Sequence, residues 1–216
     1  MSLAIGDVAP DLKLTDTEGK PFDLASVKGK KVYLCFLRYG ACMMCALRVA
    51  EAKKRAKALK DQGLVMMLVM NSTAKEIQPY GAGKLADADL QILCDREGTA
   101  YQAYKTKKSC MASPLGCAMC IHTCGDCRMP QAACGCCNSL AFGKGTCGPC
   151  CGFMNCSTQH MDSSRAQQMP ADFLIDENGK LVDVLYGSSI GKHMPWSKIE
   201  AFASGKDLNA PQQQQM

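Results

Sequence analysis

The junction between an apolar run and a helical pattern constrains the fold of this chain more than any other feature. The run covers residues 31–37 (KVYLCFL), and the sequence RYGACMMC follows it at residues 38–45. We therefore expect a strand that ends near Leu37 and a helix that begins at Cys42, runs to about Asp61 and stops at Gly63. Its apolar residues recur at steps of four and three, as on one face of a helix: Cys45, Val49, Ala52, Ala56 and Leu59.

Two cysteines stand at this junction, separated by two residues. Cys42 is expected in the first turn of the helix, where unpaired N–H groups and the positive end of the helix dipole lower a thiol pKa. A Cys-x-x-Cys motif beside a βαβ pattern is typical of a redox site. The alternatives are two small buried side chains or half of a metal site. Arg38 either places positive charge beside the thiolate or forms a salt bridge at the strand end.

The remaining pattern predicts an α/β fold. Expected strands cover residues 11–14, 21–24, 64–70, 90–94, 171–175 and 181–186, and expected helices cover 74–79, 97–104 and 196–203. Alternating strands and helices imply a layered sandwich with a largely parallel central sheet, closed by an antiparallel hairpin. We assign residues 1–104 and 169–208 to this domain, 105–168 to a cysteine-rich insert and 209–216 to a disordered, glutamine-rich tail.

Composition narrows the classes of protein. The net charge of +5, with charges of both signs interspersed and 6% aromatic residues, is too mild to indicate nucleic-acid binding. No run approaches the ~18 apolar residues of a membrane span, and because no charged segment is followed by an apolar one, we expect no secretion signal. Of the 16 cysteines, 12 lie between Cys110 and Cys156. The rest of the chain carries an ordinary cysteine load, so we expect a reducing compartment, the cytoplasm.

The chain resembles the peroxiredoxin family of the alkyl hydroperoxide reductase/thiol-specific antioxidant type. Besides Cys-x-x-Cys after the first long strand, which is similar to a thioredoxin fold, three stretches carry the resemblance. They are GDVAPD at residues 6–11 with LKL at 12–14, FLIDENGK at 173–180, and YG at 186–187 with GKHMP at 191–195. The last is similar to the ending of the peroxiredoxin-like branch of the family. The resemblance covers about residues 5–104 and 169–204 and implies a thioredoxin-like three-layer α/β/α sandwich.

The resemblance also implies a thiol oxidoreductase with antioxidant activity. In the thioredoxin-like interpretation Cys42 is the exposed attacking thiolate, Cys45 resolves the mixed disulfide, and Pro170 occupies the cis-proline position against the pair. Typical peroxiredoxins place proline seven and threonine three positions before the peroxidatic cysteine, whereas Arg38 and Cys42 stand there before Cys45. This departure favours dithiol–disulfide exchange over direct peroxide reduction; if a peroxide is the substrate, the family pattern favours Cys45 as the cysteine attacked. His193 is expected to be structural.

The insert is a candidate metal subdomain. It has almost no Val, Ile or Leu, so an apolar core cannot hold it. Two Cys-x-x-Cys pairs complete a tetrahedral Cys₄ zinc site, and a structural zinc supplies on the order of 10 kcal/mol toward folding. Iron–sulfur and copper remain alternatives, as do disulfides or disorder. The predicted ligands form four such pairs: Cys117 and Cys120, Cys124 and Cys127, Cys134 and Cys137, Cys147 and Cys150.

Two functions of different classes follow. The first is a thiol-dependent oxidoreductase that acts on a small thiol, a disulfide or a peroxide, receives electrons from a thioredoxin-type donor, and carries a metal-binding insert. The second is a metal store, sensor or chaperone on a thioredoxin scaffold, in which Cys42 and Cys45 hold or transfer the metal. Substitution of either cysteine by serine separates them.

Overall fold

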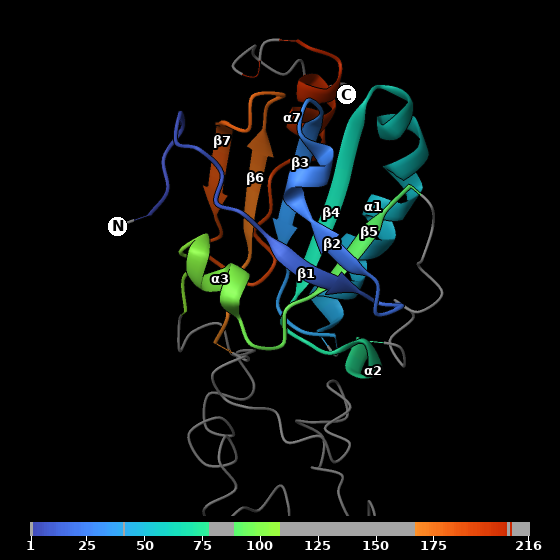
Figure 1. Ribbon diagram of the computed structural model, residues 1–216, viewed down its shortest axis with the longest axis vertical. Helices are drawn as coiled ribbons and strands as arrows, with labels where there is room; N and C mark the ends of the chain where they lie inside the picture. Colours follow the sequence, from blue (N-terminus) through green and yellow to red (C-terminus); the bar gives the residue numbers. More distant parts are fainter. Residues whose placement is uncertain (1, 41, 78–88, 109–166, 207, 209–216) are drawn as a thin grey trace, which may run out of the picture.

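The computed structural model describes residues 2–40, 42–77, 89–108, 167–206 and 208. The predicted metal ligands of the insert and the predicted tail lie outside these residues, as does part of the helix predicted at 74–79. Figure 1 shows one sheet with helices around it. Along the chain the elements are β1 (Lys13–Asp16), β2 (Pro21–Asp23), η1 (Leu24–Val27), β3 (Lys31–Phe36), α1 (Met43–Asp61), β4 (Leu64–Met70), α2 (Ala74–Ile77), β5 (Gln91–Cys94), α3 (Thr99–Ala103), β6 (Ala171–Ile175), β7 (Leu181–Tyr186) and α7 (Trp196–Ala203).

The sheet is mixed, and the expectation of a largely parallel sheet was wrong. Its order is β2-β1-β5-β4-β3-β6-β7. In the described part of the chain, only the pairs β3–β4 and β4–β5 are parallel. Parallel neighbours need a long crossover connection, and α1 supplies it between β3 and β4. The amino-terminal hairpin adds β1 antiparallel to β5, and β6 returns antiparallel to β3. The sequence pattern could not show that the hairpin extends the same sheet.

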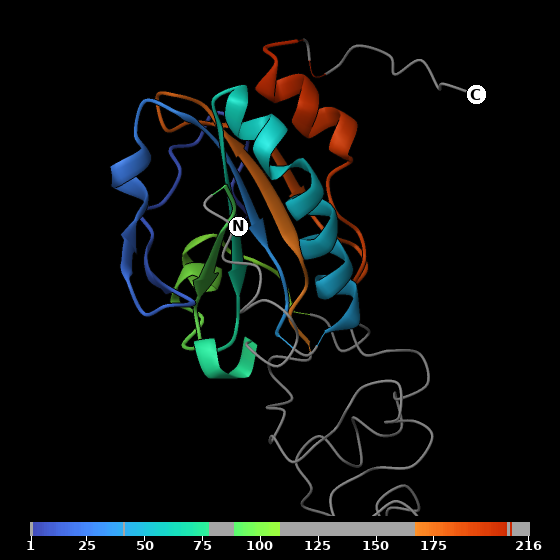
Figure 2. The ribbon, with the colours of Figure 1, turned by 90° about the vertical axis from the view of Figure 1, so that its right-hand side faces the viewer.

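The layers follow from the burial of both sheet faces. Figure 2 shows α1 and α7 on one side of the sheet and α3 on the other. The apolar stripe of α1 is buried under one face, with each of its five members at most 2% exposed. Tyr101 and Tyr104 pack under the opposite face around Phe36 and Phe173. The structure is thus the predicted three-layer α/β/α sandwich, with continuously apolar central strands because both of their faces are covered.

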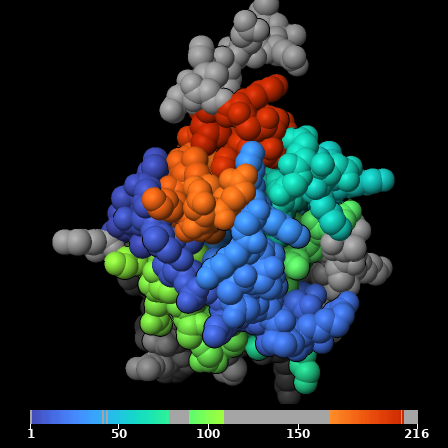
Figure 3. Space-filling view, turned by 45° about the horizontal axis from the view of Figure 1, so that its top comes forward, coloured from blue at the N-terminus to red at the C-terminus, as the bar shows by residue number. Residues whose placement is uncertain are grey.

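The two ends of the domain lie side by side. Figure 3 shows the amino-terminal segment, in blue, against the β6–β7 hairpin and α7, in orange and red. Gly6 N–H donates to the Leu181 carbonyl, and Leu181 N–H donates to the Asp7 carbonyl. Lys31 Nζ also donates to the Phe202 carbonyl at 3.0 Å. These contacts join segments that the insert separates in sequence. Among the described residues, none of the helices combines the length and apolar character needed to cross a bilayer.

Candidate redox site at the start of α1

The loop after β3 carries the candidate site. Cys42 is the residue that precedes the first turn of α1, with extended backbone angles of −78° and 114°. Its N–H donates to the Tyr39 carbonyl, and its own carbonyl accepts from Ala46. Cys42 thus begins the helix as the sequence predicts, at the positive end of the helix dipole. Cys45, in the first turn, points toward the end of β3, where Arg38 N–H donates to its Sγ at 3.3 Å.

Arg38 brings positive charge to the pair. Its Nη1 lies 3.6 Å from Cys42 Sγ, and its Nε donates to the Gln168 carbonyl at 3.0 Å. The side chain is 1% exposed and stacks over the Tyr39 ring, with 5.1 Å between the guanidinium carbon and the ring centroid. The structure thus places the positive charge of Arg38 beside the Cys42 thiol.

The two thiols differ in acidity. A hydrogen bond from Cys45 is the largest influence on Cys42, followed by burial, which opposes it, and by the charge of Arg38. Together they lower the pKa of Cys42 from its usual value to about 6. Burial is the main cause that raises the pKa of Cys45 well above its usual value, and the neighbouring Cys42 adds to it. Near neutral pH the pair therefore holds one thiolate, on Cys42, and one thiol, on Cys45.

Cys42 is not the exposed thiol that the thioredoxin-like interpretation predicts. It is 3% exposed and Cys45 is 1% exposed. The Cys42 sulfur turns inward because the groups that stabilise it, the Arg38 guanidinium and the Cys45 thiol, are themselves buried. The Cys42 thiolate is thus stabilised by interior contacts.

Pro170 lies at the expected edge of the sheet, but the peptide bond before it is trans, not cis. Ala171 pairs with Phe36, so the residues before β6 stand beside the loop that follows β3. The described residues contain no cis peptide bond, which makes the Met169–Pro170 bond trans. The trans backbone extends the chain so that Met169 N–H donates to the Lys107 carbonyl while the Gln168 carbonyl accepts from Arg38. The cis expectation was wrong, although the position of the turn was not.

The ends of the insert meet at this site. Lys108 and Gln168 form an isolated antiparallel bridge, and Gln168 Nε2 donates to Thr106 Oγ1 at 2.8 Å. Gln168 is 1% exposed and connects this base of the insert to Arg38. The sequence reasoning did not identify Gln168. A polar residue a few positions before an apolar strand is too common to reveal that its carbonyl accepts from an arginine 130 residues earlier.

A second group of polar side chains lies in the core around the middle of β3. Only its histidine, His193, was considered from the sequence. Tyr33 hydroxyl donates to Asp172 Oδ1 at 2.8 Å and accepts from Arg48 Nη2 at 2.7 Å. His193, expected to be structural because it is remote in sequence from the cysteines, lies 3.7 Å from Cys35 through its Nδ1. The charged Asp172 inside the otherwise apolar strand ADFLI is the sequence signal that could have indicated this group.

Comparisons with known proteins agree with the geometry. Residues 5–128, more than half of the chain, match the AhpC/TSA family. The thiol-disulfide oxidoreductase ResA of Bacillus subtilis (strain 168) is 29% identical over 104 residues, which are 48% of this chain and 56% of that protein. The chain therefore spans little more than half the length of this curated relative.

Solved structures share the fold. The peroxidoxin BcpB of Mycobacterium tuberculosis matches with a TM-score of 0.57 and 15% identity, over 98% of this chain and 99% of that chain. The thioredoxin domain of a thiol-disulfide oxidoreductase from Bacteroides vulgatus matches with a TM-score of 0.51 and 18% identity, over 94% of this chain and 99% of that chain. At such identities the likeness shows the fold alone, and that fold is the predicted thioredoxin-like one.

Proposed function

The chain belongs to the AhpC/TSA family, and on this premise we propose that it is a thiol-dependent oxidoreductase that exchanges disulfides through Cys42 and Cys45. One observation carries the proposal. A cysteine of depressed pKa lies 3.6 Å from a buried arginine and accepts a hydrogen bond from a second, protonated cysteine three residues later. A nucleophilic thiolate and a resolving thiol at this distance in sequence are the two groups that dithiol exchange requires.

The exchange runs in two balanced steps. Cys42 thiolate attacks one sulfur of a substrate disulfide, the substrate S–S bond breaks, and the other sulfur leaves as a thiolate that takes up a proton. Cys45 then loses its proton and attacks Cys42 Sγ, which breaks the mixed disulfide and releases the second substrate thiol. The substrate gains two electrons and two protons, and the protein keeps a Cys42–Cys45 disulfide. A thioredoxin-type donor or a small thiol returns the pair to the dithiol state.

Cys42 is the attacking residue in this scheme because the electrostatics of the pair separate the two roles. The Arg38 charge and the Cys45 hydrogen bond favour a thiolate on Cys42, whereas burial disfavours one on Cys45. Cys45 becomes a nucleophile only when it loses its proton, so its raised pKa keeps it the less reactive of the two thiols until it resolves the mixed disulfide. The similarity to a thiol-disulfide oxidoreductase supports disulfides as the substrate class.

Peroxide reduction is the second candidate, and the family supports it. A thiolate attacks one peroxide oxygen, the O–O bond breaks, and the other oxygen leaves as hydroxide or an alkoxide that takes up a proton. The cysteine becomes a sulfenic acid, and the other cysteine then condenses with it to a disulfide, releasing water. The Arg38 N–H that donates to Cys45 Sγ is the observation that favours Cys45 for this reaction, as the family pattern does. The pKa order of the pair favours Cys42.

The insert is proposed to bind zinc through the four Cys-x-x-Cys pairs named above, with an iron–sulfur cluster as the alternative. The metal would fold the segment in place of an apolar core. The convergence of Lys108 and Gln168 beside Arg38 supports an insert that is attached next to the redox pair. We further propose that the protein works in the cytoplasm, since free thiols at Cys42 and Cys45 need reducing surroundings.

Single substitutions of the pair test the function. In an assay with a small disulfide and excess reductant, Cys42→Ser is expected to abolish turnover without any protein–substrate adduct. Cys45→Ser is expected to abolish turnover while a Cys42–substrate mixed disulfide accumulates, which mass spectrometry detects. Cys94→Ser, at a half-buried thiol on β5, is the matched control and should retain activity.

Parallel measurements separate the alternatives. With hydrogen peroxide, a sulfenic acid trapped on Cys42 in Cys45→Ser, or on Cys45 in Cys42→Ser, would establish peroxidase chemistry and identify the attacked thiol. Unchanged metal content in both variants supports the oxidoreductase. Full disulfide turnover in Cys42→Ser would reject the oxidoreductase function. Loss of metal from the cysteine variants, together with a wild type that shows no turnover, would reject it in favour of the metal-handling function.

A further inference from the structure

The polar group in the middle of the core brings three different donor atoms together. Cys35 on β3 and Asp172 on β6 are paired residues of neighbouring strands. His193, from the segment between β7 and α7, places Nδ1 at 3.7 Å from Cys35 Sγ and 3.1 Å from Asp172 Oδ2. The sulfur, nitrogen and oxygen atoms all lie within 4.8 Å of one another. We propose that Cys35, Asp172 and His193 bind one divalent cation of the zinc class.

The spacing matches the geometry of such an ion. Zinc binds thiolate sulfur at ~2.3 Å and imidazole or carboxylate atoms at ~2.0 Å in a tetrahedron. Those bond lengths place sulfur and nitrogen ~3.5 Å apart and nitrogen and oxygen ~3.3 Å apart. The observed separations of 3.7 Å and 3.1 Å require shifts of only a few tenths of an ångström. A mixed S, N and O donor set favours a borderline ion such as Zn²⁺ over Mg²⁺ or Ca²⁺, which prefer oxygen alone.

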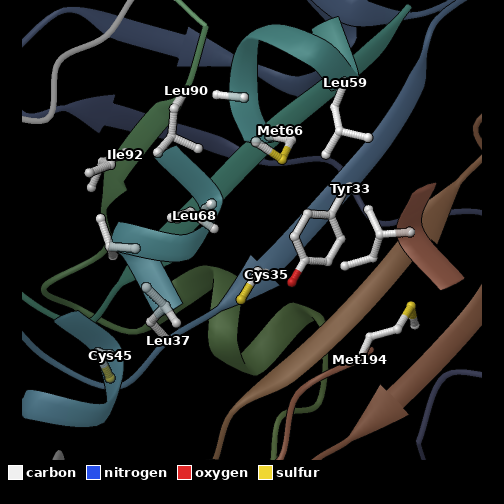
Figure 4. Close-up of a cluster of buried hydrophobic side chains, with 14 of the residues drawn as sticks. Tyr33, Cys35, Leu37, Cys45, Leu59, Met66, Leu68, Leu90, Ile92 and Met194 are labelled. Atoms are coloured by element: carbon white, nitrogen blue, oxygen red, sulfur yellow. The ribbon is translucent and has the colours of Figure 1, made fainter. Parts of the chain in front are cut away.

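Hydrogen bonds from outside the trio fix the position of the Asp172 carboxylate. Tyr33 hydroxyl donates to Asp172 Oδ1, and Met194 N–H donates to Oδ2 at 2.6 Å. Arg48 in turn donates to Tyr33 hydroxyl and to the Met194 carbonyl, at 2.7 and 2.8 Å. Figure 4 shows Tyr33 and Cys35 on β3 with Met194 across from them. Metal ligands are commonly fixed by such outer hydrogen bonds, which keep the donor atoms in place before the ion arrives.

Charge and access are consistent with an ion at this place. Zn²⁺ displaces the proton of the Cys35 thiol, so the thiolate and the Asp172 carboxylate balance its two charges. Arg48 keeps its bonds to Tyr33 and Met194 and needs no new partner. Cys35 and Asp172 are fully buried, but the His193 side chain is 7% exposed and follows the exposed residues 188–189 and 191–192. An ion therefore enters through the segment that carries His193.

The site is separate from the redox pair. The trio contains neither Cys42 nor Cys45, and it uses a cysteine for which disulfide exchange has no role. Burial raises the pKa of Cys35 well above its usual value, so without metal it is an inert thiol. The proposal therefore stands or falls independently of the oxidoreductase function, and it adds to any metal in the insert.

The experiment measures the nitrogen NMR signals of the histidines, of which the chain has only three. The full-length protein is labelled with ¹⁵N-histidine, reduced and stripped of metal without oxygen, and then titrated with Zn²⁺ alone. His193→Gln assigns the His193 signals against those of His122 and His160. The expected result is that Zn²⁺ converts Nδ1 of His193 to the metal-bound form and that total zinc exceeds that of His193→Gln by one ion per chain.

Two variants test the proposed ligand Cys35 and the hydrogen bond from Tyr33 to Asp172 separately. Cys35→Ala should abolish the change at His193, and Tyr33→Phe should weaken the zinc affinity of this site by about 10–100-fold. Cys94→Ala is the matched control and should leave the change intact. An unchanged His193 signal in the wild type, once elemental analysis shows the chain saturated with zinc, would show that the trio is only a hydrogen-bonded group. This outcome is measured on the wild-type protein, so it does not depend on whether the Cys35 and Tyr33 variants fold.

Discussion

At the scale of single residues, the acidity of Cys42 depends on two neighbours, Cys45 and Arg38. The hydrogen bond from Cys45 contributes most, and the Arg38 charge adds to it against the opposing effect of burial. The interior thus separates two chemically identical thiols into a nucleophile and a proton donor. That separation is testable through the pH dependence of reactivity, because only the thiolate reacts with an alkylating reagent.

The reaction of Cys42 with iodoacetamide should therefore rise with pH and level off above about 6, whereas an ordinary cysteine levels off above ~8.5. Arg38→Met removes the positive charge, so the Cys42 pKa should rise by about 1 to 3 and the midpoint should move upward with it. Arg38→Lys keeps a charge and should move the midpoint less. Site-resolved mass spectrometry of the Cys42 peptide measures each profile.

The partner thiol provides the second arm of this test. Cys45→Ala removes the hydrogen-bond donor and should raise the midpoint further than Arg38→Met, because that bond is the largest influence. Cys45→Ser keeps a hydroxyl donor in place and should raise it less. Identical midpoints in the wild type and both alanine and methionine variants would contradict the assignment of these causes.

The Tyr33 hydroxyl connects two buried charges and should matter for stability. It donates to Asp172 and accepts from Arg48, so Tyr33→Phe leaves both with an unmade hydrogen bond. The expected loss in the free energy of unfolding is about 1–3 kcal/mol, measured by urea denaturation of reduced, metal-free protein. Tyr186→Phe removes a half-buried hydroxyl between Leu3 and Tyr104 and is the control, expected to cost less. Equal losses would contradict the argument.

At the scale of elements, the end of β7 holds the turn before β6 in position. Gly187 N–H donates to the Pro170 carbonyl, and a side chain at Gly187 would meet the Lys192 carbonyl at 2.7 Å and Pro170 Cγ at 2.8 Å. Both are stiff obstacles, one a backbone atom and the other a ring. The Pro170 turn in turn places the Gln168 carbonyl against Arg38. β7 thus supports the redox pair without touching it.

Gly187→Ala should therefore destabilise the protein by about 1–3 kcal/mol, because the added methyl group overfills a close backbone contact. It should also shift the pH midpoint of Cys42 alkylation, since Arg38 follows the turn. Gly191→Ala is the matched control: its methyl group meets only the mobile end of the Met44 side chain, at 2.8 Å. It should change stability by about 0.5 kcal/mol or less. Equal effects of the two substitutions in urea denaturation would refute this account.

At the scale of the whole molecule, the insert leaves and re-enters the domain at one place. Lys107 accepts from Met169 N–H, and Lys108 bridges to Gln168, so the chain on either side of the insert already forms a paired base. Residues 2–108 and 167–206 meet through the sheet and through the contacts of Gly6 and Lys31 with the carboxyl-terminal part. The domain therefore does not need the insert to bring its two halves together.

Replacement of residues 109–166 by a short glycine-rich turn should leave a folded domain with a cooperative urea transition and native near-ultraviolet circular dichroism. A shorter loop costs less entropy to close, so the shortened chain should be about 2 kcal/mol more stable than the metal-free full chain. Elemental analysis should show the loss of all metal except the ion at Cys35, Asp172 and His193. A shortened chain without a cooperative transition would show that the insert is part of the fold.

The sequence by itself determined the elements and the position of the redox pair. The α1 stripe, the bounds of β4, β6, β7 and α7, and the glycine that ends α1 follow from local periodicity and local steric rules, which the chain carries in neighbouring residues. The alternating order of those elements predicted a layered α/β fold. The family followed from the resemblance of its motifs, such as GDVAPD at residues 6–11 and FLIDENGK at 173–180. The same sequence suggested Arg38 as a source of positive charge beside the thiolate.

Only the tertiary structure decided the rest. The mixed sheet, the trans bond before Pro170, the burial of Cys42 and the meeting of Cys35 with Asp172 and His193 all depend on residues that are distant in sequence. Which strands pair, and which side chains then share an interior with little water, is set by the packing of the whole domain. The pKa of a thiol is set by that same interior. The interior lowers the pKa of Cys42 and raises that of Cys45, although the two lie in the same short motif.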